Sequence, residues 1–391
     1  MKKLRSILLL SLMAALLGGA VGAVSAGFLH FIEWAQELLW QVLTPGLPLQ
    51  SLVICTLGGL LVGLCQRYLG DHPKNIKESV TAISKTGRLE YDHLPHGMTT
   101  ASISLIFGAS LGPESAIIDL IGGLSTWVGD VIRALRQRFD LPRPTQAENW
   151  LVKLLQSWPN LIALAIGTVA FLKLLAGLYG GGFLNFREIF QWSDLLWSIP
   201  CGLTGAAGGY LFMRLQTWSK KLAAPMKQKP VLRGTLGGFT LGLLALFLPL
   251  MLFSGQHGLQ QAYEQASQLG FVSLLLIALA RLFIINWLLA TGWKGGQFLP
   301  IMFSGAAFGL AISVLFPVIS APAAVLSVMA ALLAVVIPKP IIALILMMLM
   351  FPLQYLGISV VAVGLVMLGQ RLWKKRPDQA LSEVAVQPAS D

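Results

Sequence analysis

Long stretches without charged residues constrain this chain more than any other feature. From Ser6 to Phe28 there is no ionisable side chain, over a length sufficient to cross a bilayer core of about 30 Å. Similar apolar stretches recur near residues 49–64, 159–172, 193–213, 234–253, 270–292, 301–337 and 341–369. Only 12% of the residues are charged, whereas soluble domains carry about a quarter. The sequence therefore predicts an all-α polytopic membrane protein.

The N-terminus is open to two interpretations. Lys2, Lys3 and Arg5 precede an apolar run, which is also the pattern of a cleavable signal peptide. The run is longer than a normal signal core, and its glycines suit helix packing. We therefore expect a retained first membrane segment.

The net charge of +11 is compatible with nucleic-acid binding, but the position of the basic residues indicates membrane topology instead. They flank the apolar segments, as the positive-inside rule requires. Because both chain ends are basic, we expect both termini on the cytoplasmic side of a bacterial inner membrane. We expect one membrane domain over residues 1–377, with approximate halves 1–190 and 191–377, followed by a short disordered tail over 378–391.

Two apolar segments are broken where a membrane helix should be continuous. The first break reads GASLGPESA over residues 108–116, and the second reads TGWKGGQFLPIMFSGAAFG over residues 291–309. Irregular backbone at membrane depth is tolerated where protein or a water-filled cavity satisfies it, and paired breaks in two halves mark a binding site between inverted repeats. A helix that begins at mid-membrane presents free N–H groups, so this site favours an anion.

Glu114 stands inside the first break. A carboxylate in an anion pathway is itself an anion, so it can occupy an ion site and compete with the permeating ion until it is protonated. Burial raises the pKa of a carboxyl group and nearby positive dipoles lower it, so such a group can respond to pH. The alternative is a glutamate with a purely structural, helix-capping role.

Other site chemistries have weaker support. Cys55, Cys65 and Cys201 are an odd number without the spacing of a disulfide framework or a zinc site. His93 and His96 flank Pro95 and are expected in a loop. We expect neither a metal nor another cofactor.

An intramembrane hydrolase is the alternative from another functional class. Ser110 and Ser115 flank the first break as candidate nucleophiles, but no histidine stands at helical spacing to activate them.

Both breaks carry a family resemblance. Gly112-Pro113-Glu114-Ser115-Ala116 stands where the CLC family of chloride channels and proton-coupled chloride exchangers has G-R-E-G-P. The family's G-x-F-x-P motif is matched more cleanly, by the five residues from Gly296 to Pro300. The chain resembles this family, most clearly in its C-terminal half.

The resemblance implies a fold and a site. It implies inverted repeats of tilted and interrupted helices, a homodimer with one pathway in each subunit, and transport of chloride or a related small anion through the lipid bilayer. Glu114 would be the gate. The anion would be bound by residues of the two breaks, chiefly through backbone amides: Gly112, Gly296, Gln297, Phe298 and Leu299.

The sequence also departs from the family. The motif G-S-G-I-P-E is replaced by residues 73–78, where Lys74 or the Asn75 amide could supply the donor that the missing serine would have given. No matched inner glutamate is visible for a proton, and Tyr355 stands too early to be the late tyrosine of the family. These departures favour a channel-like pathway over proton-coupled exchange, and leave both open.

Overall fold

The computed structural model describes residues 2–45, 49–72, 89–138 and 184–374 of the 391-residue chain. Within these ranges the regular structure is helical, and the one extended pairing is an isolated antiparallel bridge between Gly112 and Gly296. The predicted all-α class is confirmed.

The chain forms two compact units that alternate along the sequence. The first unit comprises Met1–Gly181, Met226–Leu246 and Thr291–Gly296, and the second comprises Gly182–Pro225, Phe247–Ala290 and Gln297–Asp391. The second sequence break is therefore divided, because Gly292, Gly295 and Gly296 belong to the first unit and helix α11 (Phe298–Leu315) belongs to the second. The expected halves, which meet near residue 190, are a different division and stay a prediction.

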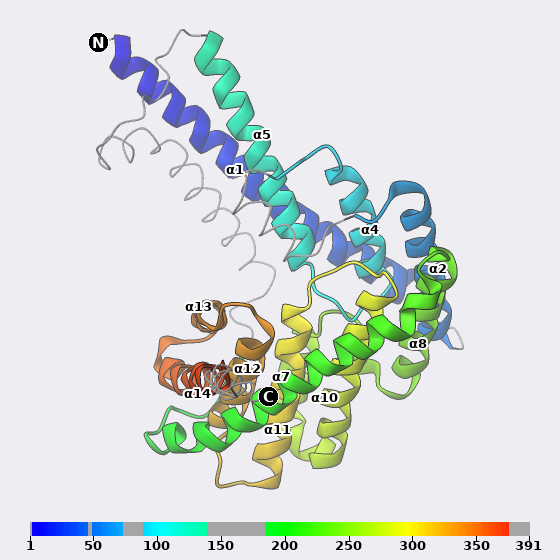
Figure 1. The fold of residues 1–391 in the computed structure, drawn as a ribbon, viewed down its shortest axis with the longest axis vertical. Helices are drawn as coiled ribbons and strands as arrows, with labels where there is room; N and C mark the ends of the chain where they lie inside the picture. The colour runs from blue at the N-terminus through cyan, green and yellow to red at the C-terminus, as the bar shows by residue number, and fades with distance from the viewer. Residues whose placement is uncertain (1, 46–48, 73–88, 139–183, 375–391) are drawn as a thin grey trace, which may run out of the picture. The chain divides into compact units, whose positions relative to one another are not determined.

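The described part of the first unit contains long helices and two shorter ones, α4 and η1. Helix α1 and helix α5 lie side by side in Figure 1 and contact each other. Helix α4 contacts α1, α2 and α5. The bounds are α1 (Lys2–Glu37), the π-helix η1 (Leu38–Leu43), α2 (Gln50–Leu69), α4 (Leu94–Ile106), α5 (Glu114–Arg138) and α8 (Pro230–Phe247).

Glycines bring α2 and α8 together. A side-chain carbon placed on Gly59 would overlap the backbone of Gly234, and one placed on Gly238 would overlap the carbonyl oxygen of Cys55. Membrane helices lack a hydrophobic driving force between them, so small residues stabilise them by allowing close backbone contact. Helices α2 and α8 are thus closely packed in the first unit.

The second unit surrounds a short buried helix. Helix α12 contacts α7, α11, α13 and α14, and almost all of its residues are buried. A helix that is apolar on every side suits such an enclosed position. The bounds are α7 (Ser193–Ala223), α9 (Gln256–Glu264), α10 (Ala266–Ala290), α11 (Phe298–Leu315), α12 (Ala321–Val336), α13 (Pro340–Met350) and α14 (Leu356–Lys374), with short 3₁₀ turns η2 (Ala224–Met226), η3 (Pro249–Met251) and η4 (Leu353–Tyr355).

Six helices of the described part are long and apolar enough to cross a membrane: Gln50–Leu69, Ser193–Met226, Pro230–Phe247, Ala266–Ala290, Phe298–Leu315 and Leu353–Leu372. The apolar stretch near 301–337 contains two helices, α11 and α12, because Pro317 interrupts it and Ser320 caps the second helix. The stretch near 341–369 is likewise divided, at Phe351 and Pro352. The stretch near 159–172 lies outside the described residues.

Candidate site at the paired helix breaks

The two breaks meet in the first unit. The Gly112 N–H donates to the Gly296 carbonyl oxygen at 2.8 Å, and the Gly296 N–H donates to the Gly112 carbonyl oxygen at 2.5 Å. This reciprocal pair is an antiparallel bridge. Each glycine stands two residues before a helix, since α5 begins at Glu114 and α11 begins at Phe298. The two halves of the sequence thus contribute matching segments to one bridge.

Small residues are required at this bridge. A side-chain carbon on Gly295 would overlap the Leu111 side chain and lie 3.1 Å from the Gly112 carbonyl oxygen. Leu111 itself is fully buried. Glycine is the residue that permits such close backbone approach, which explains the Gly-Pro and Gly-Gly pairs in the two breaks.

The Glu114 carboxylate covers the bridge. A side-chain carbon on either Gly112 or Gly296 would overlap the same oxygen, Glu114 Oε2. Glu114 is also the first residue of α5, where the helix dipole and the unpaired N–H groups of the first turn favour a negative charge. The arrangement therefore places one anionic group over glycines from both breaks.

Contacts to three helices hold the second break in position. The Gly292 carbonyl oxygen accepts a hydrogen bond from Gln66 Nε2 on α2. The Trp293 indole donates to the Gly234 carbonyl oxygen on α8 at 3.0 Å. The Lys294 N–H donates to Ser104 Oγ on α4 at 3.0 Å. Gly296 is thus the end of a segment fixed along most of its length.

The remaining predicted site residues have different placements. Gln297 is the N-cap of α11, and Phe298 and Leu299 are its first two residues. Pro300 occupies the third position, where its missing N–H removes no intrahelical bond. Lys74 and Asn75 lie outside the described residues, so their expected role as anion ligands stays a prediction.

Comparison with known proteins identifies the family. The family described as voltage gated chloride channel matches residues 149–367, which is more than half of the chain. The chain belongs to this family. The predicted CLC resemblance is confirmed, and anion transport by a multi-pass membrane protein is the functional class. The matched range contains Gly296 and the start of α11 but begins after Glu114.

Individual relatives of this CLC chain are distant. It is 28% identical over 351 residues to the "Putative ion-transport protein YfeO" of Salmonella paratyphi A, covering 78% of this chain and 80% of the relative. A CLC-type fluoride/proton antiporter matches its fold with a TM-score of 0.67 at 16% identity, over 91% of this chain and 94% of the other. A slow cyanobacterial Cl⁻/H⁺ antiporter matches with a TM-score of 0.65 at 20% identity, over the same shares.

The CLC chain differs from the family motif in the neighbours of Glu114 in its first break. Gly112 and Glu114 agree with the first glycine and the glutamate of G-R-E-G-P, whereas Pro113, Ser115 and Ala116 replace its arginine, second glycine and proline, so the difference lies in these neighbours and not in the position of the glutamate. Glu114 still reaches the bridge because it begins α5 and its carboxylate lies over both glycines.

Two serines of the same break, which the sequence suggests as candidate nucleophiles, have a different environment from the one that role needs. Ser110 and Ser115 are buried, and neither hydroxyl has a hydrogen-bond partner among the described residues. Buried hydroxyl groups are normally paired, so these two are further candidate donors to an anion. The sequence signal was present, since both residues adjoin the Leu-Gly-Pro-Glu core of the break.

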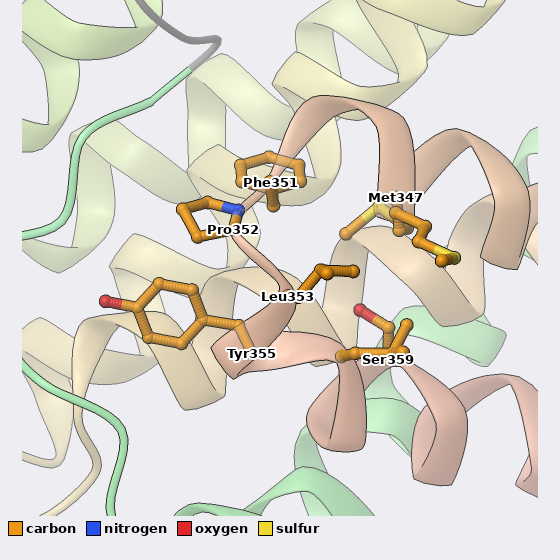
Figure 2. A pocket seen from close by; sticks show the side chains of 8 residues that line it. Met347, Phe351, Pro352, Leu353, Tyr355 and Ser359 are labelled. Atoms are coloured by element: carbon orange, nitrogen blue, oxygen red, sulfur yellow. The ribbon is translucent and has the colours of Figure 1, made fainter.

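The Tyr355 hydroxyl already has a hydrogen-bond partner in the second unit. Tyr355 is buried in the second unit, and its hydroxyl donates to the Glu188 carbonyl oxygen at 2.7 Å. Figure 2 shows its ring beside a pocket lined by Met347, Phe351 and Leu353 among others, with the hydroxyl directed away from Ser359. The pocket is mainly apolar and has no basic side chain in its lining.

Proposed function

We propose that this chain conducts chloride or a related small anion through a channel-like pathway gated by Glu114. The observation that supports this most is the position of the Glu114 carboxylate over the Gly112–Gly296 bridge. A carboxylate there occupies the space that an anion would need at the two glycines. The ion and the side chain therefore exclude each other.

Two events would open this gate. An arriving anion competes with the carboxylate for the positive end of α5, and a proton removes the charge that holds the carboxylate there. Once it is protonated, the Glu114 side chain is no longer attracted to the N-terminus of α5. An anion then binds there more strongly than the side chain does. The pathway should consequently respond to both anion concentration and pH.

Most of the anion ligands in this proposal are uncharged donors. In the first unit they are the Ser110 and Ser115 hydroxyls. The resemblance to the family adds the amides at Gln297, Phe298 and Leu299, since a helix leaves its first N–H groups without intrahelical partners. Lys74 or Asn75 would complete the set from the segment that replaces the family's serine motif. Subunits would pair as a homodimer, each with its own pathway.

Proton-coupled exchange is the second candidate. It is favoured by the solved structures that share the fold, because two of them are named antiporters. We give it second place because an exchanger needs an inner proton acceptor. Glu188, one candidate for that role, lies exposed in the second unit and accepts a hydrogen bond from the Tyr263 hydroxyl at 2.8 Å.

Transport by the full chain in sealed liposomes tests the gate. We expect Glu114→Gln to raise anion flux and to remove its pH dependence, because an amide of equal size cannot compete as an anion. Glu264→Gln is the matched control, since it neutralises an exposed glutamate at the end of α9. Normal, pH-dependent flux in Glu114→Gln would leave Glu114 with a structural role.

The same liposomes separate the two candidate functions. A chloride gradient is imposed and proton movement is recorded. A channel moves chloride without driving protons uphill, whereas proton pumping at a fixed ratio would establish the exchanger.

A further inference from the structure

We propose that Lys294 is a docking residue for the permeating anion and that the Asp71 carboxylate occupies it when no ion is bound. This inference rests on the proposed anion transport and adds a second ion position in the first unit. Lys294 Nζ and Asp71 Oδ1 are 2.7 Å apart. The Asp71 carboxylate thus occupies the position beside the Lys294 ammonium group that a permeating anion would take.

The two partners differ in freedom. The Lys294 side chain is only 14% exposed, whereas that of Asp71 is 80% exposed. The Lys294 backbone is fixed, since its N–H donates to Ser104 and the next-but-one residue, Gly296, is bonded to Gly112. Asp71 follows the C-terminus of α2, beyond Gly70. Lys294 thus extends from a fixed backbone and is largely buried, whereas the exposed Asp71 carboxylate is the partner that can leave.

Basic side chains lie near the pair and act on the Asp71 carboxyl. Desolvation opposes ionisation of Asp71, but Lys294, Arg233 and His72 together outweigh it and lower the pKa of the Asp71 carboxyl. Arg233 bonds to the neutral side chain of Gln66 at 2.7 Å. Two basic side chains, Lys294 and Arg233, therefore act on the Asp71 carboxylate, and a local concentration of one charge sign attracts small counter-ions.

Lys294 also lies close to the proposed gate. It is two residues before Gly296, and two residues of extended chain span at most about 7 Å. Gly296 is one of the two glycines covered by the Glu114 carboxylate. An anion at Lys294 would therefore be one short step from the bridge, and the two carboxylates, Asp71 and Glu114, would be displaced in turn.

A purely structural ion pair is the alternative. An ion pair with one solvent-exposed partner contributes little to stability, so in that case loss of Asp71 would change neither anion binding nor transport. The docking role predicts the opposite for binding, because removal of an internal competitor strengthens the external ligand.

Calorimetric titration of the detergent-solubilised full chain with sodium bromide, at constant ionic strength, tests this. We expect Asp71→Asn to lower the bromide Kd by about two- to five-fold, the factor that corresponds to an exposed ion pair. Lys294→Met should weaken binding, Lys294→Arg should retain it, and Asp71→Asn should have no effect in the Lys294→Met background. Glu90→Gln, which neutralises an exposed acid of the first unit, is the control.

Two results would overturn the docking role: an unchanged Kd in Asp71→Asn, or an equal gain with Lys294 absent. Binding that depends on Lys294 without anion flux in liposomes would instead overturn the transport proposal and retain the site. Flux that depends on Glu114, with binding indifferent to Asp71, would retain the transport proposal alone.

Discussion

At the scale of single residues, the absence of a side chain matters as much as its presence. Gly112 and Gly296 leave the space that the Glu114 carboxylate fills, and the carboxylate is the flexible end of its side chain. An added methyl group would therefore displace the Glu114 carboxylate rather than the backbone.

Gly296→Ala is accordingly expected to act on transport. The methyl group should push the Glu114 carboxylate from the bridge, so anion flux should rise and lose part of its pH dependence. The melting temperature in detergent should change little. Liposome flux at several pH values measures the effect, and flux identical to the wild type would contradict the proposed position of the gate.

At the scale of elements, close helix packing depends on glycines that face backbone rather than side chains. Gly238→Ala is the matched contrast to Gly296→Ala, because its methyl group would overlap the Cys55 carbonyl oxygen, which cannot move alone. We expect separation of α2 and α8 and a loss of roughly 1–3 kcal/mol of stability. Thermal unfolding in detergent measures this loss of stability. A melting temperature equal to that of the wild type would show that α2 and α8 leave room for a methyl group at Gly238.

Arg281 has a comparable structural role in the second unit. It is fully buried on α10, donates to the carbonyl oxygens of Leu250 and Phe253, and stacks on the Phe303 ring at 4.2 Å. It thereby ties the segment before α9 to α10 and α11.

Replacement of Arg281 by lysine should destabilise the second unit. A single ammonium group cannot reproduce the two-pronged geometry of the guanidinium group, and one carbonyl oxygen would lose its partner at a cost of about 1–3 kcal/mol. We expect a lower melting temperature in detergent together with retained pH dependence of flux. A stable variant with altered pH response would instead connect Arg281 with the proposed gate at Glu114.

At the scale of the whole molecule, topology follows from charge. Basic residues flank both ends of the membrane domain, in MKKLR at residues 1–5 and in RLWKKRP at residues 371–377, and such residues are retained on the cytoplasmic side. We expect both termini there and an even number of crossings. A reporter that is active only in the periplasm, fused to the C-terminus, should be inactive, whereas an active fusion would reverse the assignment of that end.

The sequence by itself determined the class of the molecule and the position of its breaks. Charge-free stretches and the Gly-Pro and Gly-Gly pairs are local signals, so they predicted a helical membrane protein interrupted near Glu114 and near Gly296. Local signals also support the family assignment, since the cleaner motif, from Gly296 to Pro300, lies within the matched range. Hydropathy alone could not show that the stretch near 301–337 contains two helices, because both helices are similarly apolar.

Only the tertiary structure decided which distant groups meet. The bridge joins residues 112 and 296, and the ion pair joins residues 71 and 294; neither separation leaves a periodic trace in the sequence. The Glu114 carboxylate covers both glycines because α5 begins at that residue while the second break is held by α2, α4 and α8. Hydropathy reports how each segment partitions into lipid, whereas backbone bonds and ion pairs depend on contacts that exist once the segments have packed.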